Sequence, residues 1–215
     1  MNKFQAGLIA FLALVVGVYA AIYLAPPGSN TKTQHISLYP QVRALPDFTL
    51  VSHKGEDVTS ETLKGHWSLV FVGYTYCPDI CPTTLAELKN IYPDLQKIPT
   101  DSPIQVMLIS VDPKRDTPER LNEYINFFHP EFIAVSGEHA QLFPLVRAMG
   151  MMYSMSESTD NPNYLVDHSS SVVVVNPQAQ VVGRFKPDFE AGKLPVSEGE
   201  QILADMPAVI AGAAL

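Results

Sequence analysis

The sequence predicts one α/β domain with a mixed β-sheet flanked by helices. The chain has 215 residues, of which 47% are hydrophobic, so it can bury a core of ordinary size. Strand and helix patterns alternate through its middle part, which indicates parallel strands joined by helices. Towards the end come a hairpin pattern and a further helix, and a hairpin adds antiparallel strands to the sheet.

The predicted elements follow one another from residue 47. Strands are predicted at 47–53, 67–74, 104–112 and 132–137 and in two arms within 169–185, and helices at 82–98, 117–128 and 139–150 and from about 196. The run WSLVFVGY is almost continuously apolar, which is typical of a strand buried on both faces. Thr117 and Pro118 are a suitable N-cap and first residue for the helix that they begin.

The first 46 residues are predicted to lie outside this domain. Residues 4–25 contain Gln5 as their only strongly polar side chain, and they are long enough to span a hydrocarbon core of about 30 Å as a helix. A cleaved signal peptide is the alternative, but its apolar part is usually only about 7–15 residues long. We therefore predict a membrane anchor over 1–25 and, from its Pro, Gly, Ser and Thr content, a linker over 26–46.

The predicted domain covers 47–206, and residues 207–215 form an apolar C-terminal tail with no assigned role. Lys3 precedes the apolar span, which favours a cytoplasmic N-terminus. The expected location is the inner (cytoplasmic) membrane, crossed once, with the domain in the periplasm, where a disulfide can persist. The formal net charge of -8 and the lack of Lys and Arg clusters argue against nucleic acid as a partner.

The only two cysteines, Cys77 and Cys81, lie between a predicted strand and a predicted helix. Pro78 and Pro82 disfavour helical conformation at the residues before them, so the helix is expected to begin near Pro82. A helix N-terminus stabilises a thiolate, which is both the nucleophile and the metal-binding form of cysteine. A purely structural disulfide would close too short a loop to stabilise the fold much. The pair therefore indicates metal binding or redox exchange.

A metal site here needs a further ligand, because two thiolates alone do not make a structural zinc or iron-sulfur site. His168 directly precedes a long apolar strand, although a histidine at a strand edge is more often structural. Two thiolates with one imidazole suit copper, since sulfur favours Cu(I) and imidazole helps to hold Cu(II). Asp79 and Asp167 are candidates to orient the histidine or tune the thiols from outside the ligand set. The other histidines are expected in solvated or capping positions, and Met149, Met151, Met152 and Met155 in the core.

Three stretches together resemble the Sco/SenC family: YTYCPDICPTTLAEL (74–88), SVDPKRDTPERLNEY (110–124) and YLVDHSSSVVVVNP (164–177). Members of this family are membrane-anchored thioredoxin-fold proteins that deliver copper to cytochrome c oxidase. The resemblance implies a thioredoxin-like fold and a single copper ion, Cu(I) or Cu(II), held by Cys77, Cys81 and His168.

The resemblance also implies the partners and the role. They are the copper A-bearing subunit of cytochrome c oxidase and other copper-carrier proteins, and the role is copper insertion, reduction of the thiols of that site, or both. Such a chaperone is not an enzyme. The alternative is a periplasmic thiol-disulfide oxidoreductase, in which Cys77 and Cys81 form a redox-active disulfide and His168 only tunes a thiol. The VDPKRDTP stretch is assigned to the fold and to surface recognition.

Overall fold

A computed structural model describes residues 5, 7, 11–17, 33–155 and 159–212. The chain divides into two compact units, Met1–Lys32 and Thr33–Leu215. In the first unit, residues 11–17 are helical, and the rest of the predicted anchor over 1–25, apart from residues 5 and 7, lies outside the described residues. Among the residues that are described, no helix combines the length and the apolar character needed to cross a membrane. The anchor stays a prediction.

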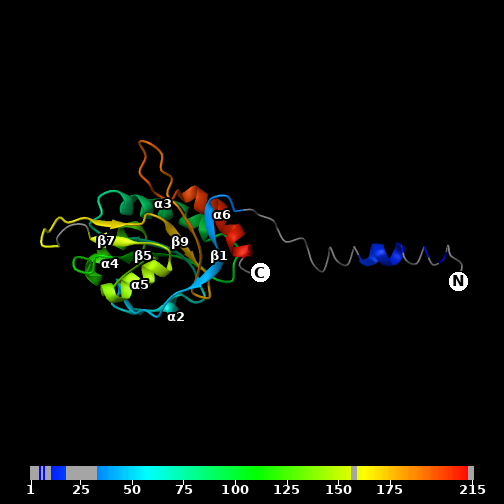
Figure 1. Cartoon of the computed structure of the whole chain (residues 1–215), viewed down its shortest axis with the longest axis horizontal. Coiled ribbons are helices and arrows are strands. Elements are labelled where there is room, and N and C mark those ends of the chain that lie inside the picture. The colour runs from blue at the N-terminus through cyan, green and yellow to red at the C-terminus, as the bar shows by residue number, and fades with distance from the viewer. Residues whose placement is uncertain (1–4, 6, 8–10, 18–32, 156–158, 213–215) are drawn as a thin grey trace. The chain divides into compact units, whose positions relative to one another are not determined.

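The second unit contains an eight-stranded sheet with the order β1-β10-β9-β4-β5-β6-β2-β3 (Figure 1). Its strands are β1 (Ile36–Ala44), β2 (Leu50–Ser52), β3 (Asp57–Val58), β4 (Trp67–Gly73), β5 (Ile104–Ser110), β6 (Ile133–Ser136), β9 (Val172–Val175) and β10 (Gln180–Phe185). The pairs β4-β5 and β5-β6 are parallel and the others antiparallel. A separate two-stranded sheet joins β7 (Tyr153–Met155) to β8 (Val166–His168). The predicted α/β class with a mixed sheet is confirmed.

Strand β4 forms the centre of the core. It pairs with β5 on one side and with β9 on the other, and all of its residues are buried. Both faces are therefore covered, which explains why its sequence lacks the polar alternation of a half-exposed strand. The prediction for this strand is confirmed, and it fixes the position of the cysteine turn that follows it.

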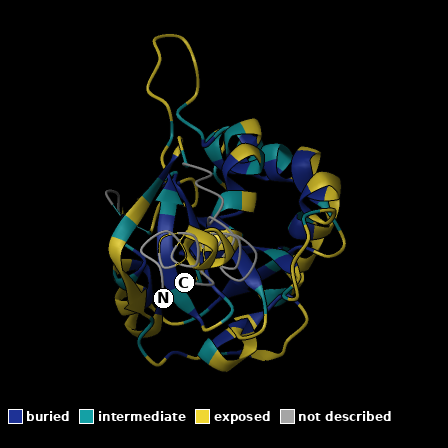
Figure 2. Ribbon diagram, turned by 90° about the vertical axis from the view of Figure 1, so that its right-hand side faces the viewer, coloured by how far each residue is buried: buried dark blue, intermediate teal, exposed yellow. Residues whose placement is uncertain are grey.

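The helices are α2 (Ser60–Leu63), α3 (Ile80–Leu95), α4 (Pro118–Phe128), α5 (His139–Ala148) and α6 (Gly199–Gly212). Helix α3 packs against α6, and α4 packs against β6. In Figure 1, α3 and α6 lie together on one side of the strands, and α5 lies on the other side. Buried residues concentrate in the strands and on the inner faces of the helices, as Figure 2 shows. Thr117 accepts a hydrogen bond from the Arg120 amide, so its predicted role as N-cap of α4 is confirmed.

The linker predicted over 26–46 requires correction at its C-terminal part. Residues Ile36–Ala44 form β1, which pairs antiparallel with β10. Strand β1 lies at the edge of the sheet and most of it is exposed, so its sequence has little apolar periodicity. Its Pro40 falls where the register shifts between Leu38 and Arg43, and an edge strand tolerates proline at such an irregularity.

The tail predicted over 207–215 also needs correction, because α6 continues to Gly212. Pro207 lies inside the helix, and the buried Met206 and Val209 on either side of it belong to one packed face. Asp205 of the same helix accepts hydrogen bonds from the backbone amides of residues 34–36, which connects α6 to the start of β1.

Candidate metal centre

The two cysteines lie at the carboxyl end of β4, where the chain turns into α3. Cys77 is partly exposed in the turn, whereas Cys81 is fully buried in the first turn of the helix. The Cys81 amide donates to Cys77 Sγ at 3.4 Å, so the start of the helix directs a backbone N–H at this sulfur. The helix begins at Ile80, two residues before the predicted Pro82. The expected placement of both thiols at a helix N-terminus agrees with this geometry.

The histidine reaches the cysteines from the small sheet. His168 is the last residue of β8 and lies opposite Tyr153 of β7. In the segment before it, Tyr164 and Val166 are buried and Leu165 is exposed, so alternation along the strand directs His168 inwards. Its Nε2 lies 3.3 Å from Cys81 Sγ.

Backbone hydrogen bonding sets the tautomer of His168. Its Nδ1 lies 3.2 Å from the carbonyl oxygen of Ser169, and a carbonyl can only accept, so Nδ1 carries the proton. In this tautomer the lone pair of Nε2 faces the cysteines. The rings of Phe71 and Tyr74 meet the imidazole edge-on, each with a centroid distance of 5.8 Å, and limit its rotation.

The donor atoms of Cys77, Cys81 and His168 all lie within 4.8 Å of one another. This group combines two sulfurs with an imidazole nitrogen whose lone pair points inwards. Such a set suits copper in either oxidation state and leaves a fourth position open for exchange with another protein. The structure thus brings together the three residues that the sequence singled out.

The two thiols have opposite protonation preferences. The pKa of Cys77 is lowered to about 4, mainly because the Cys81 thiol is hydrogen-bonded to its sulfur, and burial only partly opposes this effect. Burial raises the pKa of Cys81, and the same hydrogen bond raises it further. Near neutral pH the pair therefore holds one thiolate, on the more accessible sulfur, and one buried thiol.

Asp79 and Asp167, proposed to act on the ligands from outside the ligand set, occupy different positions in the structure. Asp79 is exposed and is the N-cap residue of α3, and its backbone amide contributes to the lowered pKa of Cys77. Asp167 is exposed beside His168 in β8, so by alternation its side chain leaves the strand on the other face. The group that holds His168 Nδ1 is a backbone carbonyl. A role for either carboxylate in orienting the ligands stays a prediction.

A cavity of about 450 Å³ borders His168, and its walls include Phe143, Arg147, Met152 and Tyr153. Met152 is 72% exposed, whereas Met149 and Met151 are buried, so the expectation of a core position is wrong for Met152. Met152 lies directly before β7 and two positions before the exposed Ser154, so alternation places both side chains on the exposed face. The solvated position expected for His53 is also wrong, because this residue is buried beside Ala134.

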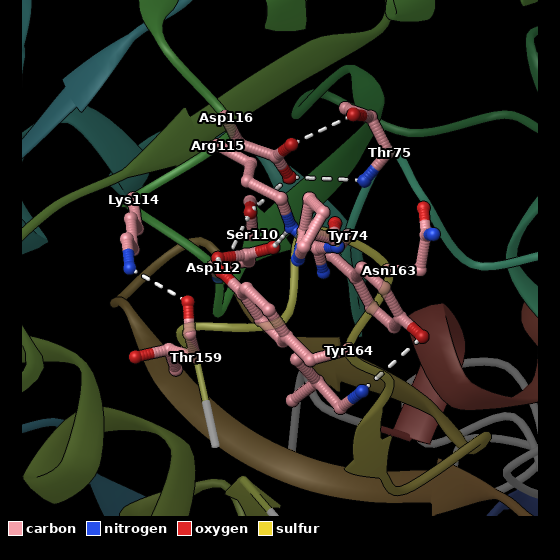
Figure 3. A network of polar contacts seen from close by, with 12 residues as sticks. Tyr74, Thr75, Ser110, Asp112, Lys114, Arg115, Asp116, Thr159, Asn163 and Tyr164 are labelled. Carbon is pink, nitrogen blue, oxygen red and sulfur yellow. Dashed lines mark hydrogen bonds and ion pairs between the residues drawn. The ribbon is translucent and has the colours of Figure 1, made fainter. Parts of the chain in front are cut away.

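A buried polar network was missed by the sequence analysis (Figure 3). Asp116 accepts hydrogen bonds from the amide and hydroxyl of Thr75 and from the hydroxyl of Ser110. Asp112 pairs with Arg115. The available signal was the pair of aspartates in VDPKRDTP, directly after a buried strand, because polar groups at neighbouring strand ends meet at one sheet edge.

Fold and site together define a thioredoxin-like α/β domain with a Cys-Cys-His centre at the carboxyl end of its central strand. The family model described as SCO1/SenC matches residues 38–195. A SCO2-like protein of Rickettsia prowazekii is 34% identical over 191 residues, which cover 87% of this chain and 92% of that protein. The chain belongs to the SCO1/SenC family, and the resemblance seen in its motifs is confirmed.

Solved structures of relatives agree with this assignment. The structure of Arabidopsis thaliana ScoI with copper bound has a TM-score of 0.64 and 27% sequence identity, covering 76% of this chain and 96% of that one. A SCO1/SenC family lipoprotein from Bacillus anthracis has a TM-score of 0.63 with 19% identity, covering 81% of this chain and 99% of that one. The first similarity concerns a copper-bound protein, and the second supports the fold alone.

Proposed function

We propose that this protein is a copper chaperone that binds one copper ion through Cys77, Cys81 and His168. The observation that carries the proposal is the convergence of these three donors within 4.8 Å, from segments 87 residues apart in the chain. Copper is supported by the soft donor set and by the copper-bound relative. The Sco family is described as one of cytochrome c oxidase assembly proteins, and we assign to this chain a role in assembling the copper A site of that enzyme.

The protonation states suggest an order of binding. Cys77 presents a partly exposed thiolate, so it is the donor that an incoming copper ion meets first. Cys81 releases its proton when it becomes the second ligand, and His168 completes the set through Nε2. With three protein donors, a thiolate of the receiving protein can occupy the remaining position before the chaperone's own ligands leave.

The proposed partners are the copper A-bearing subunit of cytochrome c oxidase and other copper-carrier proteins, but not nucleic acid. The proposed location is the periplasmic face of the cytoplasmic membrane, with residues 1–25 as the anchor. The apolar segment and Lys3 support this arrangement.

The protonation of the thiols also favours a second candidate, a thiol-disulfide oxidoreductase. The Cys77 thiolate would attack a target disulfide to form a mixed disulfide, and the target's other sulfur would leave as a thiolate. Cys81, after losing its proton, would attack Cys77 and release the second target thiolate. The target gains two electrons in this exchange, and the chaperone becomes a Cys77–Cys81 disulfide.

The two candidates differ in what they require of His168. We expect the reduced full-length chain in detergent to bind about one copper ion, with a thiolate-to-Cu(II) charge-transfer band. His168→Ala is expected to weaken copper binding by orders of magnitude and to leave disulfide formation intact. His66→Ala is the matched control, because His66 lies in an exposed turn beside Lys64. Equal copper affinity in His168→Ala and the parent would contradict the three-ligand site.

A further inference from the structure

The turn formed by residues 112–116 contacts both the loop that carries Cys77 and the segment that leads to His168. Residues 112–116 follow β5, whose parallel neighbour β4 leads into the cysteine turn. On the cysteine side, the Asp116 carboxylate accepts from the Thr75 amide at 2.9 Å and from the Thr75 hydroxyl at 2.7 Å. Thr75 lies two residues before Cys77, so Asp116 fixes the start of the loop that presents this ligand.

The same turn holds the segment that leads to the histidine. Arg115 Nε donates to Asp112 Oδ2 at 2.5 Å, and the Tyr164 hydroxyl donates to the other oxygen of this carboxylate. Arg115 Nη1 donates to the carbonyl of Pro162 at 3.1 Å, and its guanidinium carbon lies 3.6 Å from the Tyr164 ring centroid. Figure 3 shows this arrangement. The Arg115 side chain is only 12% exposed and Asp112 is fully buried, so water screens the pair weakly.

Arg115 reaches the cysteine loop as well. Its guanidinium carbon lies 4.7 Å from the ring centroid of Tyr76, the residue before Cys77, and 5.6 Å from that of Tyr74. The Tyr74 hydroxyl in turn accepts from the amide of Val166 in β8. One guanidinium is therefore packed between the loop that carries Cys77 and the segment that carries His168.

The position of Tyr164 determines which way His168 faces. Tyr164, Val166 and His168 alternate along the chain, two positions apart, and share the inward face, while Leu165 points to solvent. A slip of one residue would turn His168 away from the cysteines. Contacts that fix the Tyr164 ring and hydroxyl therefore also fix which side chains of this strand point inwards, His168 among them.

We propose that Arg115 is a positioning residue for copper binding, which holds the Cys77 loop and the His168 strand at the separation where one ion meets all three ligands. The inference rests on the proposed copper-binding function. It gives the VDPKRDTP stretch a role in the metal site beyond the fold and surface recognition assigned to it. Arg115 is not itself a ligand, so its loss should affect the histidine donor more than the thiols.

The test compares Arg115→Gln with the parent in the reduced full-length chain. Competition titration is expected to show Cu(II) affinity about 10- to 100-fold weaker, which is typical for loss of a group that orients metal ligands. The nitrogen hyperfine coupling of His168 in the electron paramagnetic resonance spectrum should weaken or vanish, while thiolate-to-copper charge transfer persists. A role in stability alone would leave the nitrogen coupling of the folded, copper-loaded variant unchanged.

Lys114→Gln is the matched control. Lys114 is exposed in the same turn and donates to the carbonyl of Thr159, so its removal changes the local charge equally but leaves the buried contacts in place. We expect parental affinity and nitrogen coupling from it. Arg115→Lys keeps a charge beside Asp112 but loses the planar fork that stacks on Tyr164, so we expect it not to restore the coupling.

Tyr164→Phe provides a second variant that keeps the fold if Arg115→Gln does not fold. It removes only the hydroxyl that donates to Asp112 and keeps the ring under the guanidinium, so a smaller change in the same direction is expected. The proposal would be overturned if folded Arg115→Gln protein kept the parental affinity and nitrogen coupling. If Arg115→Gln does not fold, the same result in Tyr164→Phe would overturn it.

A parent that binds no copper would instead refute the proposed function. The positioning role of Arg115 would then be tested in the metal-free protein. Nuclear Overhauser contacts from the His168 ring to Phe71 and Tyr74 are expected in the parent and should be lost in the Arg115→Gln variant. Contacts retained in that variant would overturn the positioning role.

Discussion

Gly73 is the last residue of β4, and the buried sulfur of Cys81 is packed directly against it. A Cβ atom at this position would lie 2.6 Å from Cys81 Sγ and 2.9 Å from Cε1 of Phe71. Ordinary contact begins at 3.4 Å, so Gly73→Ala must separate the new carbon and the sulfur by about 0.8 Å. Metal sites tolerate changes of only about 0.2 Å in ligand distance. The substitution should therefore displace a ligand without changing any donor.

We expect two separable effects from Gly73→Ala. Overpacking of the core should lower the free energy of unfolding by about 1–3 kcal/mol, measured by urea denaturation of the metal-free protein. Displacement of Cys81 should weaken copper binding by about 10- to 100-fold, by analogy with the loss of groups that orient ligands. The assay is competition against a chelator of known affinity, under reducing conditions.

Gly137→Ala separates these two effects. A Cβ there would lie 2.8 Å from Cδ2 of Leu50, at the far end of a buried side chain of β2, so stability should fall without displacing any metal ligand. Copper affinity should then stay at the parental level. If Gly73→Ala also lost stability but bound copper as tightly as the parent, the close approach of β4 to Cys81 would not control ligand position, and the reasoning would be refuted.

Three further predictions concern protonation and the start of the domain. Alkylation of the reduced protein should modify Cys77 at a nearly constant rate from pH 6 to 8, because its pKa is lowered to about 4, while the buried Cys81 is protected. Mass spectrometry measures the rate at each cysteine. A tenfold rise in the Cys77 rate per pH unit would contradict the lowered pKa. Since ionised Cys77 stabilises the folded state, the stability lost in Cys77→Ser should grow as the pH rises from 5 to 8 and vanish as it falls through about 4, which urea unfolding at several pH values would reveal. Asp205→Asn should cost about 1–3 kcal/mol of unfolding free energy at pH 7, because the carboxylate accepts from three successive amides. Burial raises the Asp205 pKa but these amides lower it overall, so parent and variant should converge in stability as the pH falls below 3.8.

The cysteine half of the site could be predicted from sequence because its determinants are local. The apolar run of β4, the two prolines and the following helix all lie within one short segment, and they place Cys77 and Cys81 at a helix N-terminus. The histidine half could not be predicted in this way. His168 lies 87 residues after Cys81, and their contact depends on the β7–β8 pairing, so only the family resemblance indicated it.

The misassigned segments have physical explanations as well. Strand β1 pairs with the sheet along one edge only, and its exposed residues do not repeat with a strand period. The Arg115 contacts depend on three aromatic rings from two segments, which no local pattern brings together. Sequence periodicity reports which residues face a core, but it does not report which polar groups meet within it.

The scaffolds of the ligands differ in strength, and this difference explains where the polar contacts lie. Cys81 is held by α3 and by the central strand of the large sheet, which bury it completely. His168 ends a strand that pairs with β7 alone, and an isolated two-stranded pair is marginally stable in water. The His168 strand therefore depends on contacts from outside its own sheet. The largely covered Arg115 supplies them together with the buried Asp112 and Tyr164. The ligand on the weakest scaffold is the one that the charged network supports.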